Sequence, residues 1–161
     1  MQSPTHKVRY SADIVIIDLE ASCPDQDGND VQRSNIIEIG AVRLDRRSLE
    51  IVGEFSELVR PEDHPIVPFI TEITGISPAM VEGKDTFAEV GARFCAWYGP
   101  RNKAMIAAFG AYYDIPLLRK EFDRYGLDYR KHIVGGAFDL RAVTTEQIEQ
   151  RRHSYERPWN R

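Results

Sequence analysis

The sequence feature that most constrains this chain is an apolar run at 14–17, followed closely by two carboxylates, Asp18 and Glu20. An unbroken run of branched aliphatic residues is typical of a strand buried on both faces, because a half-exposed strand alternates polar and apolar residues. Residues two apart in a strand point to the same side, so both carboxylates share one face at the strand's end. Like charges placed there repel each other unless a cation lies between them. The pair therefore indicates a metal site.

Two further segments, 35–44 and 49–59, have the composition of strands and follow the first strand, 14–20. The polar turn between them, 45–48, is too short for a crossover connection. The connection at 21–34 is longer, but it also lacks a helical pattern. We therefore expect these three strands to form an antiparallel meander.

The second half of the chain alternates helical patterns with apolar strands. Thr86 and Glu89 form a capping box, which predicts the start of a helix that Gly99 closes. Asp114 is expected to cap the next helix, which would tolerate Pro116 in its first turn. The other expected helices are 69–73, a helix that Ser77 caps and Pro78 begins, and a polar helix over 141–152. The expected strands are 104–109 and 137–140.

This order of elements predicts an α/β fold with a mixed five-stranded sheet flanked by helices. Three antiparallel strands would precede helix-linked parallel strands. Sites in such sheets form at the C-terminal edges of strands, where Asp18 and Glu20 lie. We expect 1–12 to be a flexible N-terminal arm and 13–161 to be a single domain, as the length of 161 residues suggests.

The composition restricts the partners that the chain can bind. It has 21 Lys and Arg against 25 Asp and Glu, a net charge of −4, so it is not a generally basic nucleic-acid-binding protein. A carboxylate cluster that holds metals could still meet phosphates through those metals. Two cysteines, no signal-peptide pattern and no apolar run of about 20 residues predict a cytoplasmic protein without a membrane partner. The sequence does not indicate the oligomeric state.

Asp114 is the third carboxylate, and it converges with Asp18 and Glu20 if the strand before it lies parallel to the first strand. Hard divalent cations with oxygen ligands suit such a cluster, and Mg²⁺ or Mn²⁺ is expected. Two such ions about 4 Å apart would clamp an in-line displacement at phosphorus. Simpler interpretations stay open: a strand end in solvent for Asp18 and Glu20, a plain helix cap for Asp114, and a local hydrogen bond for Glu38.

The motif at 18–20, Asp-Leu-Glu, resembles the first motif of the DEDD-type 3′-to-5′ exonucleases, which have a ribonuclease-H-like fold. The likeness continues through 36–42 and 73–76, and the stretch 109–114 resembles the second motif. These motifs cover about 13–140 in the family's order. The sequence of the first motif is most similar to that of the DnaQ-like, DEDDh branch, which includes the exonucleases acting on histone mRNA ends and small RNAs.

The resemblance implies a metal-dependent 3′-to-5′ exonuclease that hydrolyses phosphodiester bonds at the 3′ ends of single-stranded nucleic acid, with RNA slightly favoured over DNA. It implies two Mg²⁺ or Mn²⁺ ions and a catalytic, metal-binding set of Asp18, Glu20 and Asp114. Contacts to sugar, base face and backbone would give little sequence preference. The implied substrate contacts are the backbone at Ala21 and Ser22, packing of Ile73 and Thr74 against the terminal base or sugar, and Tyr113 in the wall of the pocket.

The family's third motif, a general-base His followed five residues later by a fourth Asp, is not found in this chain. None of the four histidines has an Asp five residues later. We therefore expect a C-terminally incomplete domain, a fragment of a longer protein that lacks the last family helix. Two alternatives stay open: a natural variant that lost the motif, or substitution by His153 with Glu149 or Glu156. The corresponding alternative function is a nucleic-acid-binding module of this fold without catalytic activity.

Overall fold

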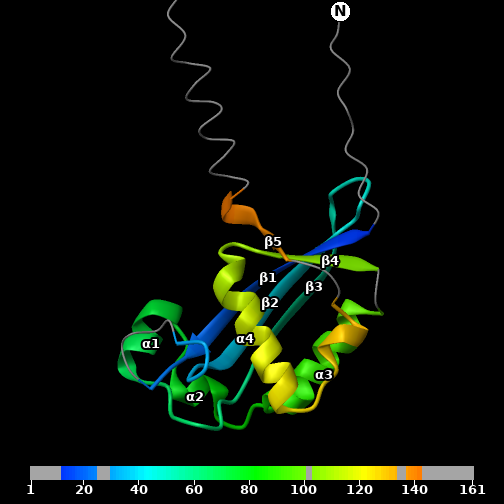
Figure 1. Ribbon diagram of the computed structural model, residues 1–161. Coiled ribbons are helices and arrows are strands. Elements are labelled where there is room, and N and C mark those ends of the chain that lie inside the picture. Colours follow the sequence, from blue (N-terminus) through cyan, green and yellow to red (C-terminus); the bar gives the residue numbers. More distant parts are fainter. Residues whose placement is uncertain (1–11, 25–29, 101–102, 134–136, 143–161) are drawn as a thin grey trace, which may run out of the picture.

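A five-stranded mixed sheet forms the centre of the fold in the computed structural model, which describes residues 12–24, 30–100, 103–133 and 137–142. The strands are β1 (Asp13–Ser22), β2 (Asn35–Leu44), β3 (Ile51–Leu58), β4 (Ala104–Ala108) and β5 (Phe138–Asp139). Their order across the sheet is β3-β2-β1-β4-β5 (Figure 1).

Strand β1 lies at the centre of the sheet because it pairs with a neighbour on each side. It runs antiparallel to β2, which in turn runs antiparallel to β3. It runs parallel to β4, which runs parallel to β5. The predicted fold class, an antiparallel meander followed by helix-linked parallel strands, is therefore confirmed.

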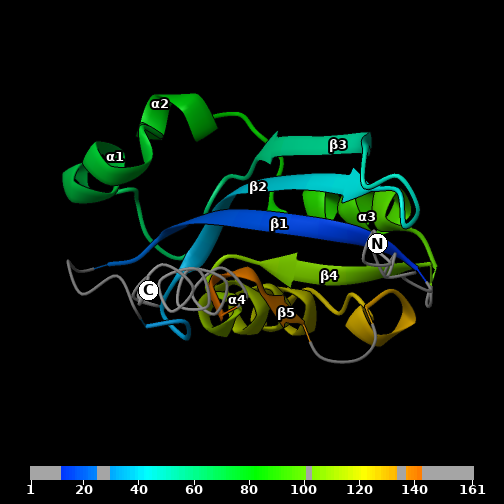
Figure 2. The same ribbon diagram turned by 90° about the horizontal axis from the view of Figure 1, so that it is seen from above.

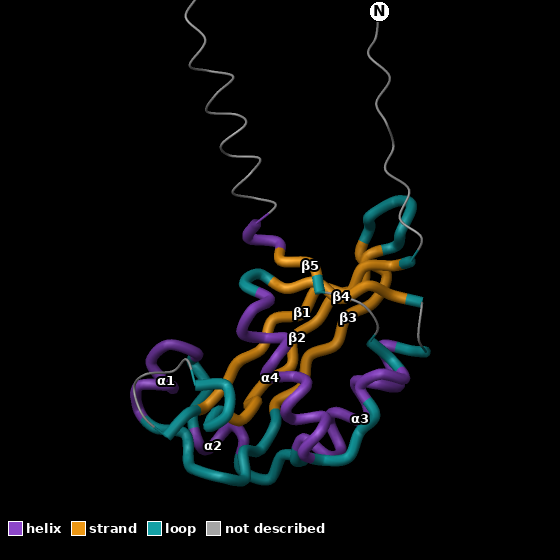
Figure 3. Tube along the Cα trace, viewed as in Figure 1, coloured by secondary structure: helices purple, strands orange, loops and turns teal. Residues whose placement is uncertain are grey.

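Helices connect the strands and cover part of the sheet. The labelled helices are α1 (Pro68–Thr74), α2 (Pro78–Val81), α3 (Phe87–Tyr98), α4 (Ala111–Arg124) and a 3-10 helix, η1 (Tyr129–Lys131). Residues 140–142 are helical as well. The two long helices, α3 and α4, lie together on one side of the sheet, as the helix colouring in Figure 3 makes clear. The two short helices, α1 and α2, lie near the C-terminal end of β1, at the left of Figure 2. The C-terminal ends of the parallel strands are thus bordered by α1 on one side and the start of α4 on the other.

The main core lies between the sheet and the helices α3 and α4. On β1, Val15 and Ile17 are buried in this core. On the opposite face of the strand, Ile14 and Ile16 are only half-buried and Asp18 is exposed. The predicted burial of β1 on both faces was therefore wrong for the part of the chain that the structure describes, because an apolar run alone does not reveal whether a second layer covers it.

A smaller apolar cluster joins α1 and α2 to the end of the sheet. Cys23 and Ile37 pack there with Ile70 of α1 and Val81 of α2. Helix α1 ends at Gly75, whose φ is 76°. Glycine adopts this left-handed conformation without a steric penalty, so the short helix predicted before it is confirmed.

The capping box predicted at the start of α3 is confirmed. The Thr86 N–H donates to the carboxylate of Glu89 at 3.0 Å, which provides a partner for a backbone donor ahead of the helix. The apolar face that follows buries Phe87, Val90 and Phe94. The capping box and the buried apolar face therefore indicate the same start for α3.

Helix α4 begins earlier than the sequence predicts. Its N-cap is Gly110, with a φ of 86°, so Asp114 lies within the first turn instead of capping the helix. Pro116 then falls beyond the first turn, inside the helix, where its missing N–H leaves a carbonyl of the preceding turn without its helical partner. Both predictions about this helix start were wrong, because an apolar pattern does not reveal a left-handed backbone at a glycine.

Some predictions concern segments outside the described residues. Residues 1–11 of the predicted arm and residues 143–152 of the predicted polar helix lie outside the described part of the chain. The possible substitutes for the third motif, His153, Glu149 and Glu156, lie outside it as well. Among the helices that the structure describes, none is long and apolar enough to cross a membrane.

Candidate active site

The C-terminal edge of β1 brings two carboxylates next to the start of α4. The parallel pairing of β1 with β4 ends at Ile17 and Ala108, so Asp18 follows directly beyond the last pair. A short turn then leads from Ala108 into the first turn of α4, which carries Asp114. The topology therefore places Asp114 at the same edge of the sheet as Asp18 and Glu20 (Figure 1).

Asp114 is the most buried of these three carboxylates, with 6% of its surface exposed. Burial, followed by the negative charges of Asp18 and Glu20, raises the pKa of Asp114 to about 7. The pKa of Glu20 is raised as well, first by burial and then by the charges of Asp18 and Glu38. The carboxylates are thus within electrostatic reach of one another. A cluster of acids whose charged forms disfavour each other is an environment that a bound cation stabilises.

The donors at this edge are carboxylate oxygens, the ligands that hard divalent cations prefer. Their chemistry fits Mg²⁺ or Mn²⁺. Their arrangement is not a complete metal site, because over the described ranges no three His, Cys, Asp or Glu side chains are grouped so that they could hold one ion. The edge therefore offers the right donor types without a finished set of ligand positions.

Strand β2 contributes two residues to this edge. Glu38 pairs across from Glu20 and accepts a hydrogen bond from the Ser56 hydroxyl at 3.4 Å, as the local interpretation of this glutamate predicts. Gly40 lies opposite Asp18, and a Cβ added at Gly40 would stand 3.3 Å from the carbonyl oxygen of Asp18. A glycine at this position lets the two strands approach closely beside the first carboxylate. The sequence alone does not indicate this role, although the glycine lies inside a recognised motif.

Ala21 and Ser22 lie where β1 leaves its regular pairing. The register with β2 shifts between Glu20 and Ala21, and irregularities of this kind re-aim side chains beside active sites. Ser22 is fully buried, and its hydroxyl has no hydrogen-bond partner among the residues that the structure describes. Both residues follow the carboxylate pair directly, but only Ala21 is partly exposed, so the structure offers no exposed surface for the contact that the sequence predicts at Ser22.

Tyr113 precedes Asp114 on α4 and is half-buried. Its hydroxyl donates to the Ser34 Oγ at 3.2 Å, and the Ser34 hydroxyl donates to the carbonyl oxygen of Asp30 at 2.8 Å. Burial raises the pKa of Tyr113, so its hydroxyl stays protonated and able to donate. The ring therefore stands between α4 and the segment that precedes β2, and its predicted place in the wall of a nucleotide pocket stays a prediction.

Helix α1 carries the two residues that are predicted to pack against a terminal base or sugar, and it contacts β1. Ile73 is exposed and therefore accessible to a ligand. The Thr74 hydroxyl donates to the Ile70 carbonyl oxygen at 2.8 Å and accepts from the Ile76 N–H at 3.0 Å. Because these bonds terminate the helix, a contact between Thr74 and a substrate would use its methyl group.

A polar cluster that the sequence did not predict fastens α4 to the start of β2. The Asn35 side-chain amide donates to the Asp63 carboxylate at 2.8 Å, and the Asp63 N–H donates back to the Asn35 side-chain oxygen at 3.2 Å. Arg124, the last residue of α4, donates to both carboxylate oxygens of Asp63, one of them at 2.6 Å. Arg124, followed by Asn35, lowers the pKa of Asp63 to about 2. We call Asn35, Asp63 and Arg124 the clamp.

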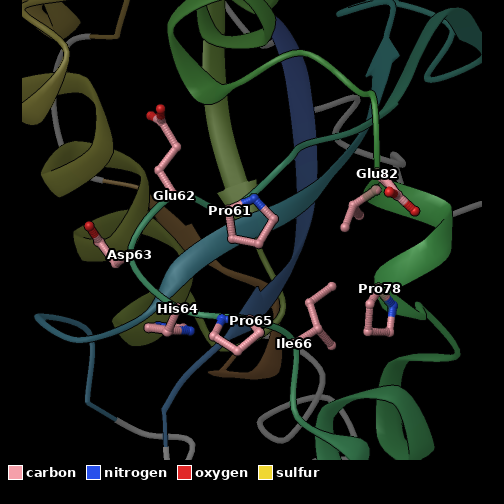
Figure 4. A pocket seen from close by; sticks show the side chains of 9 residues that line it. Pro61, Glu62, Asp63, His64, Pro65, Ile66, Pro78 and Glu82 are labelled. Carbon is pink, nitrogen blue, oxygen red and sulfur yellow. The ribbon is translucent and has the colours of Figure 1, made fainter.

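A pocket of about 360 Å³ lies between the segment that follows β3 and helix α2 (Figure 4). His64 forms part of the pocket wall, and its Nε2 lies 2.9 Å from the carbonyl oxygen of Arg33. The lining residues are Pro61, Glu62, Asp63, His64, Pro65, Ile66, Pro78, Val81 and Glu82. None of the predicted site residues lines this pocket, so it is separate from the carboxylate edge.

Comparison with known proteins relates the chain to nucleases. The model of one protein family, RNase_T, described as "Exonuclease", matches residues 15–154, which extends beyond the motifs recognised up to about residue 140. The human ERI1 exoribonuclease 3 is 37% identical over 95 residues, which are 58% of this chain and 26% of that protein. A DNA polymerase III PolC-type protein of Latilactobacillus sakei subsp. sakei (strain 23K) is 33% identical over 122 residues, 76% of this chain and 8% of that protein. The chain thus spans about a quarter or less of the length of these relatives.

Solved structures show the same architecture. The nuclease domain of 3′hExo, a DEDDh family member, bound to rAMP, is 29% identical, with a TM-score of 0.65 over 76% of this chain and 64% of that one. Exonuclease I of E. coli in complex with a dT13 oligonucleotide is 20% identical, with a TM-score of 0.68 over 85% of this chain and 30% of that one. The second likeness is one of fold alone.

Proposed function

This chain belongs to the exonuclease family whose model matches residues 15–154, and from this premise we propose that it hydrolyses phosphodiester bonds stepwise from the 3′ end of single-stranded nucleic acid. The observation that carries the proposal is the presence of Asp18, Glu20 and Asp114 at one edge of the sheet, within electrostatic reach of one another. Because the chain spans only part of its relatives, the proposal concerns this domain and no further segment.

The three carboxylates would hold two divalent ions, Mg²⁺ or Mn²⁺. Bound ions of this class supply charge stabilisation at phosphorus and make a water molecule a stronger nucleophile. The carboxylates of the chain would supply the oxygen donors. They lie near the end of strand β1 and at the start of helix α4, two regular elements that pack in the core. Rigid elements position such groups more closely than loops do.

RNA is the proposed substrate, with a slight preference over DNA. Two relatives support this choice: the human protein is named an exoribonuclease, and the 3′hExo nuclease domain is bound to rAMP. The residues proposed to hold the terminal nucleotide are Ala21 and Ser22 through their backbone, Ile73 and Thr74 through apolar contact, and Tyr113 through its ring. Contacts of this type read no base edge, so the domain would have little sequence preference.

The second candidate is a binding module of the same fold that holds nucleic acid without hydrolysing it. The observation that favours it is the missing third motif: no histidine in the 161 residues is followed by Asp at the required spacing. Loss of a general base typically lowers a rate by about 10²–10⁴-fold, so a domain without one would bind and release its ligand largely intact.

The test uses oligoribonucleotides that carry a label at the 5′ or the 3′ end, incubated with the protein and Mg²⁺ or Mn²⁺. We expect the 5′-labelled strand to shorten stepwise and the 3′ label to be released at once as a mononucleotide. Asp18→Ala should lower the rate by about 10³-fold, because a catalytic metal contributes several kcal/mol to the transition state. Glu54→Gln, an exposed acid on β3, is the matched control and should keep the wild-type rate.

Three outcomes separate the candidates. Stepwise shortening that Asp18→Ala abolishes supports the exonuclease. Retention of the strand without shortening supports the binding module. Equal shortening by the wild type and Asp18→Ala would reject the proposed site, because the activity would then not depend on the carboxylate edge.

A cytoplasmic location stays a prediction. Cys23 and Cys95 are both buried, and neither forms a disulfide. Cysteines outside disulfides are compatible with a reducing compartment, where disulfides are rare. Fluorescence microscopy of the tagged protein would test this location.

A further inference from the structure

Three aromatic side chains near Asp114 are exposed to solvent. Phe109 is 64% exposed, Tyr112 is 66% exposed and Phe138 is 52% exposed. Phe109 lies in the turn after β4, Tyr112 in the first turn of α4 and Phe138 on β5. All three therefore come from elements at the β4–β5 side of the sheet, where α4 begins (Figure 1). Phe138 pairs with Ala107, so it lies on the sheet face opposite to Ala108, which packs in the core with α4. Phe109 and Tyr112 lie in the turn and the helix start that lead to Asp114, and we call these two residues the aromatic edge.

Hydrogen bonds and a ring contact tie these elements together. The Asp139 carboxylate accepts from the Gly110 N–H at 3.1 Å and from the Arg141 N–H at 2.9 Å. The guanidinium carbon of Arg141 lies 4.9 Å from the ring centroid of Tyr112, within the range of a cation–π contact. Since β5 is thereby anchored to the turn before α4, the ring of Tyr112 and an exposed cation share one local surface.

This exposure contributes nothing to the stability of the described core. Large aromatic side chains gain free energy when they are buried, and singly exposed ones are common on any surface. Phe109 and Tyr112 are both exposed where the chain leads into Asp114, and the Tyr112 ring is held next to an arginine, so these two rings are accessible to a ligand at the carboxylate edge.

We propose that the aromatic edge binds the bases of the strand that lie upstream of the scissile phosphate, by stacking on Tyr112 and Phe109. The inference rests on the proposed function and extends it. Tyr112 lies two residues before Asp114 in the first turn of α4, so a strand whose phosphate reaches Asp114 passes close to the Tyr112 ring. Stacking on aromatic side chains tolerates every base, which suits an enzyme that removes nucleotides in succession.

Charge favours a nucleic acid as the occupant. The carboxylates of the site repel a polyanion, whereas Arg141 places an exposed cation over the Tyr112 ring, next to the Asp139 carboxylate. Arginine can contact a phosphate and also stack against a base. Its place above the Tyr112 ring restricts that ring before a ligand arrives, so less rotamer freedom is lost on binding.

The test measures the affinity of a 5′-fluorescein-labelled oligouridylate by fluorescence anisotropy in EDTA, where hydrolysis does not interfere. Tyr112→Leu keeps an apolar side chain but removes the ring, and it should weaken binding by about 5- to 30-fold, as the loss of one stacked base does. Tyr112→Phe keeps the ring and should bind like the wild type. Val52→Ala, 58% exposed on β3 at the other edge of the sheet, is the matched control and should leave the affinity unchanged.

The length of the strand provides a second readout. A dinucleotide that fills only the terminal pocket and the scissile position should bind Tyr112→Leu as tightly as it binds the wild type. The difference should appear only with longer strands, because their upstream bases reach the aromatic edge. Thermal unfolding monitored by circular dichroism should show equal midpoints for all variants, because the substituted side chains are exposed.

The outcomes separate this inference from the proposed function. Equal affinity of wild type and Tyr112→Leu for long strands, or equal weakening by Val52→Ala, would overturn the inference even if hydrolysis proceeds normally. Binding that depends on Tyr112 in a protein that shows no hydrolysis would reject the exonuclease and leave the aromatic edge in place. Absence of any oligouridylate binding by the wild type in EDTA would overturn the inference, whereas the proposed function is decided separately by the hydrolysis assay in Mg²⁺ or Mn²⁺.

Discussion

The clamp allows a stability prediction whose magnitude follows from the structure. Arg124→Met removes the charge that holds Asp63 and keeps an apolar stem of similar length. The pKa of Asp63 falls from 3.8 to about 2, and one pKa unit corresponds to about 1.4 kcal/mol, so the whole shift would amount to about 2.5 kcal/mol. The side chains of Asp63 and Arg124 are 47% and 33% exposed, and water screens such pairs. We therefore expect a loss of about 1 kcal/mol.

The sign of the pH dependence follows from the direction of this pKa shift. The pKa of Asp63 is lower in the folded protein than in the unfolded chain, where it is near 3.8. Its stabilising contribution is then fully present above about pH 4 and is lost as the pH falls toward 2. Wild type and Arg124→Met should thus differ by about 1 kcal/mol in free energy of unfolding at pH 7 and converge as the pH approaches 2.

Urea unfolding followed by tryptophan fluorescence at pH 7, 4 and 2.5 measures this difference. Lys131→Met is the control, because the Lys131 side chain is 74% exposed and its ion pair with Asp128 spans 3.5 Å. Asp63→Asn should reproduce the loss at pH 7, and the double variant with Arg124→Met should add little to it, since both changes break the same pair. A loss below about 0.3 kcal/mol, or a loss that is the same at every pH, would refute the ion-pair reasoning.

Two variants test the carboxylate edge itself. Asp114→Asn should abolish hydrolysis and weaken Mn²⁺ binding in isothermal titration, yet raise the midpoint of thermal unfolding in EDTA, because it removes a buried charge and its repulsion with Asp18 and Glu20. A lower midpoint would contradict this. Gly40→Ala should lower kcat at least about tenfold with little change in stability, since its Cβ would crowd the Asp18 carbonyl oxygen at 3.3 Å and shift the carboxylate. Gly53→Ala, whose nearest atom is the Trp97 Nε1 at 3.6 Å, is the control, and full activity of Gly40→Ala would contradict the role of close strand approach.

The central strand and its two acids could be predicted because their signals are local. Four branched apolar residues followed by Asp18 and Glu20 determine a strand and the common side of its carboxylates. The short turn between β2 and β3 excludes a crossover, and a helix between β1 and β4 permits a parallel pair. The convergence of Asp114 with the pair then follows from topology without any knowledge of side-chain contacts.

The role of Asp114 in its helix could not be predicted in the same way. An Asp near a helix start is most often a cap, because its side chain can accept from a free N–H there. In the structure Gly110 occupies that position with a φ of 86°, and Asp114 is turned inward and buried. The carboxylate is thus free of a capping role and faces the other two acids. The left-handed conformation of Gly110 determines where α4 begins and therefore whether Asp114 caps the helix. That conformation depends on the turn between β4 and α4.

The clamp left no trace in the sequence because its members are far apart in the chain. Asn35 meets Asp63 at a separation of 28 residues, and Arg124 meets Asp63 at a separation of 61. No periodic pattern or spacing connects an Asn, an Asp and an Arg across such distances. Only the packing of α4 against the sheet brings them together, so contacts of this kind become visible only in the structure.

The clamp and the carboxylate edge act at opposite ends of one helix, and this separates stability from function. Three acids in mutual reach disfavour the close approach of α4 to β1. The helix is nevertheless held, because Leu118 and Phe122 are fully buried in the core and Arg124 fastens its last residue. Since the stabilising contacts lie away from Asp114, the fold tolerates the repulsion that a metal site requires. Neutralising an edge carboxylate should then stabilise the metal-free protein, breaking the clamp should destabilise it, and the two effects should add, because distant sites without shared partners behave independently.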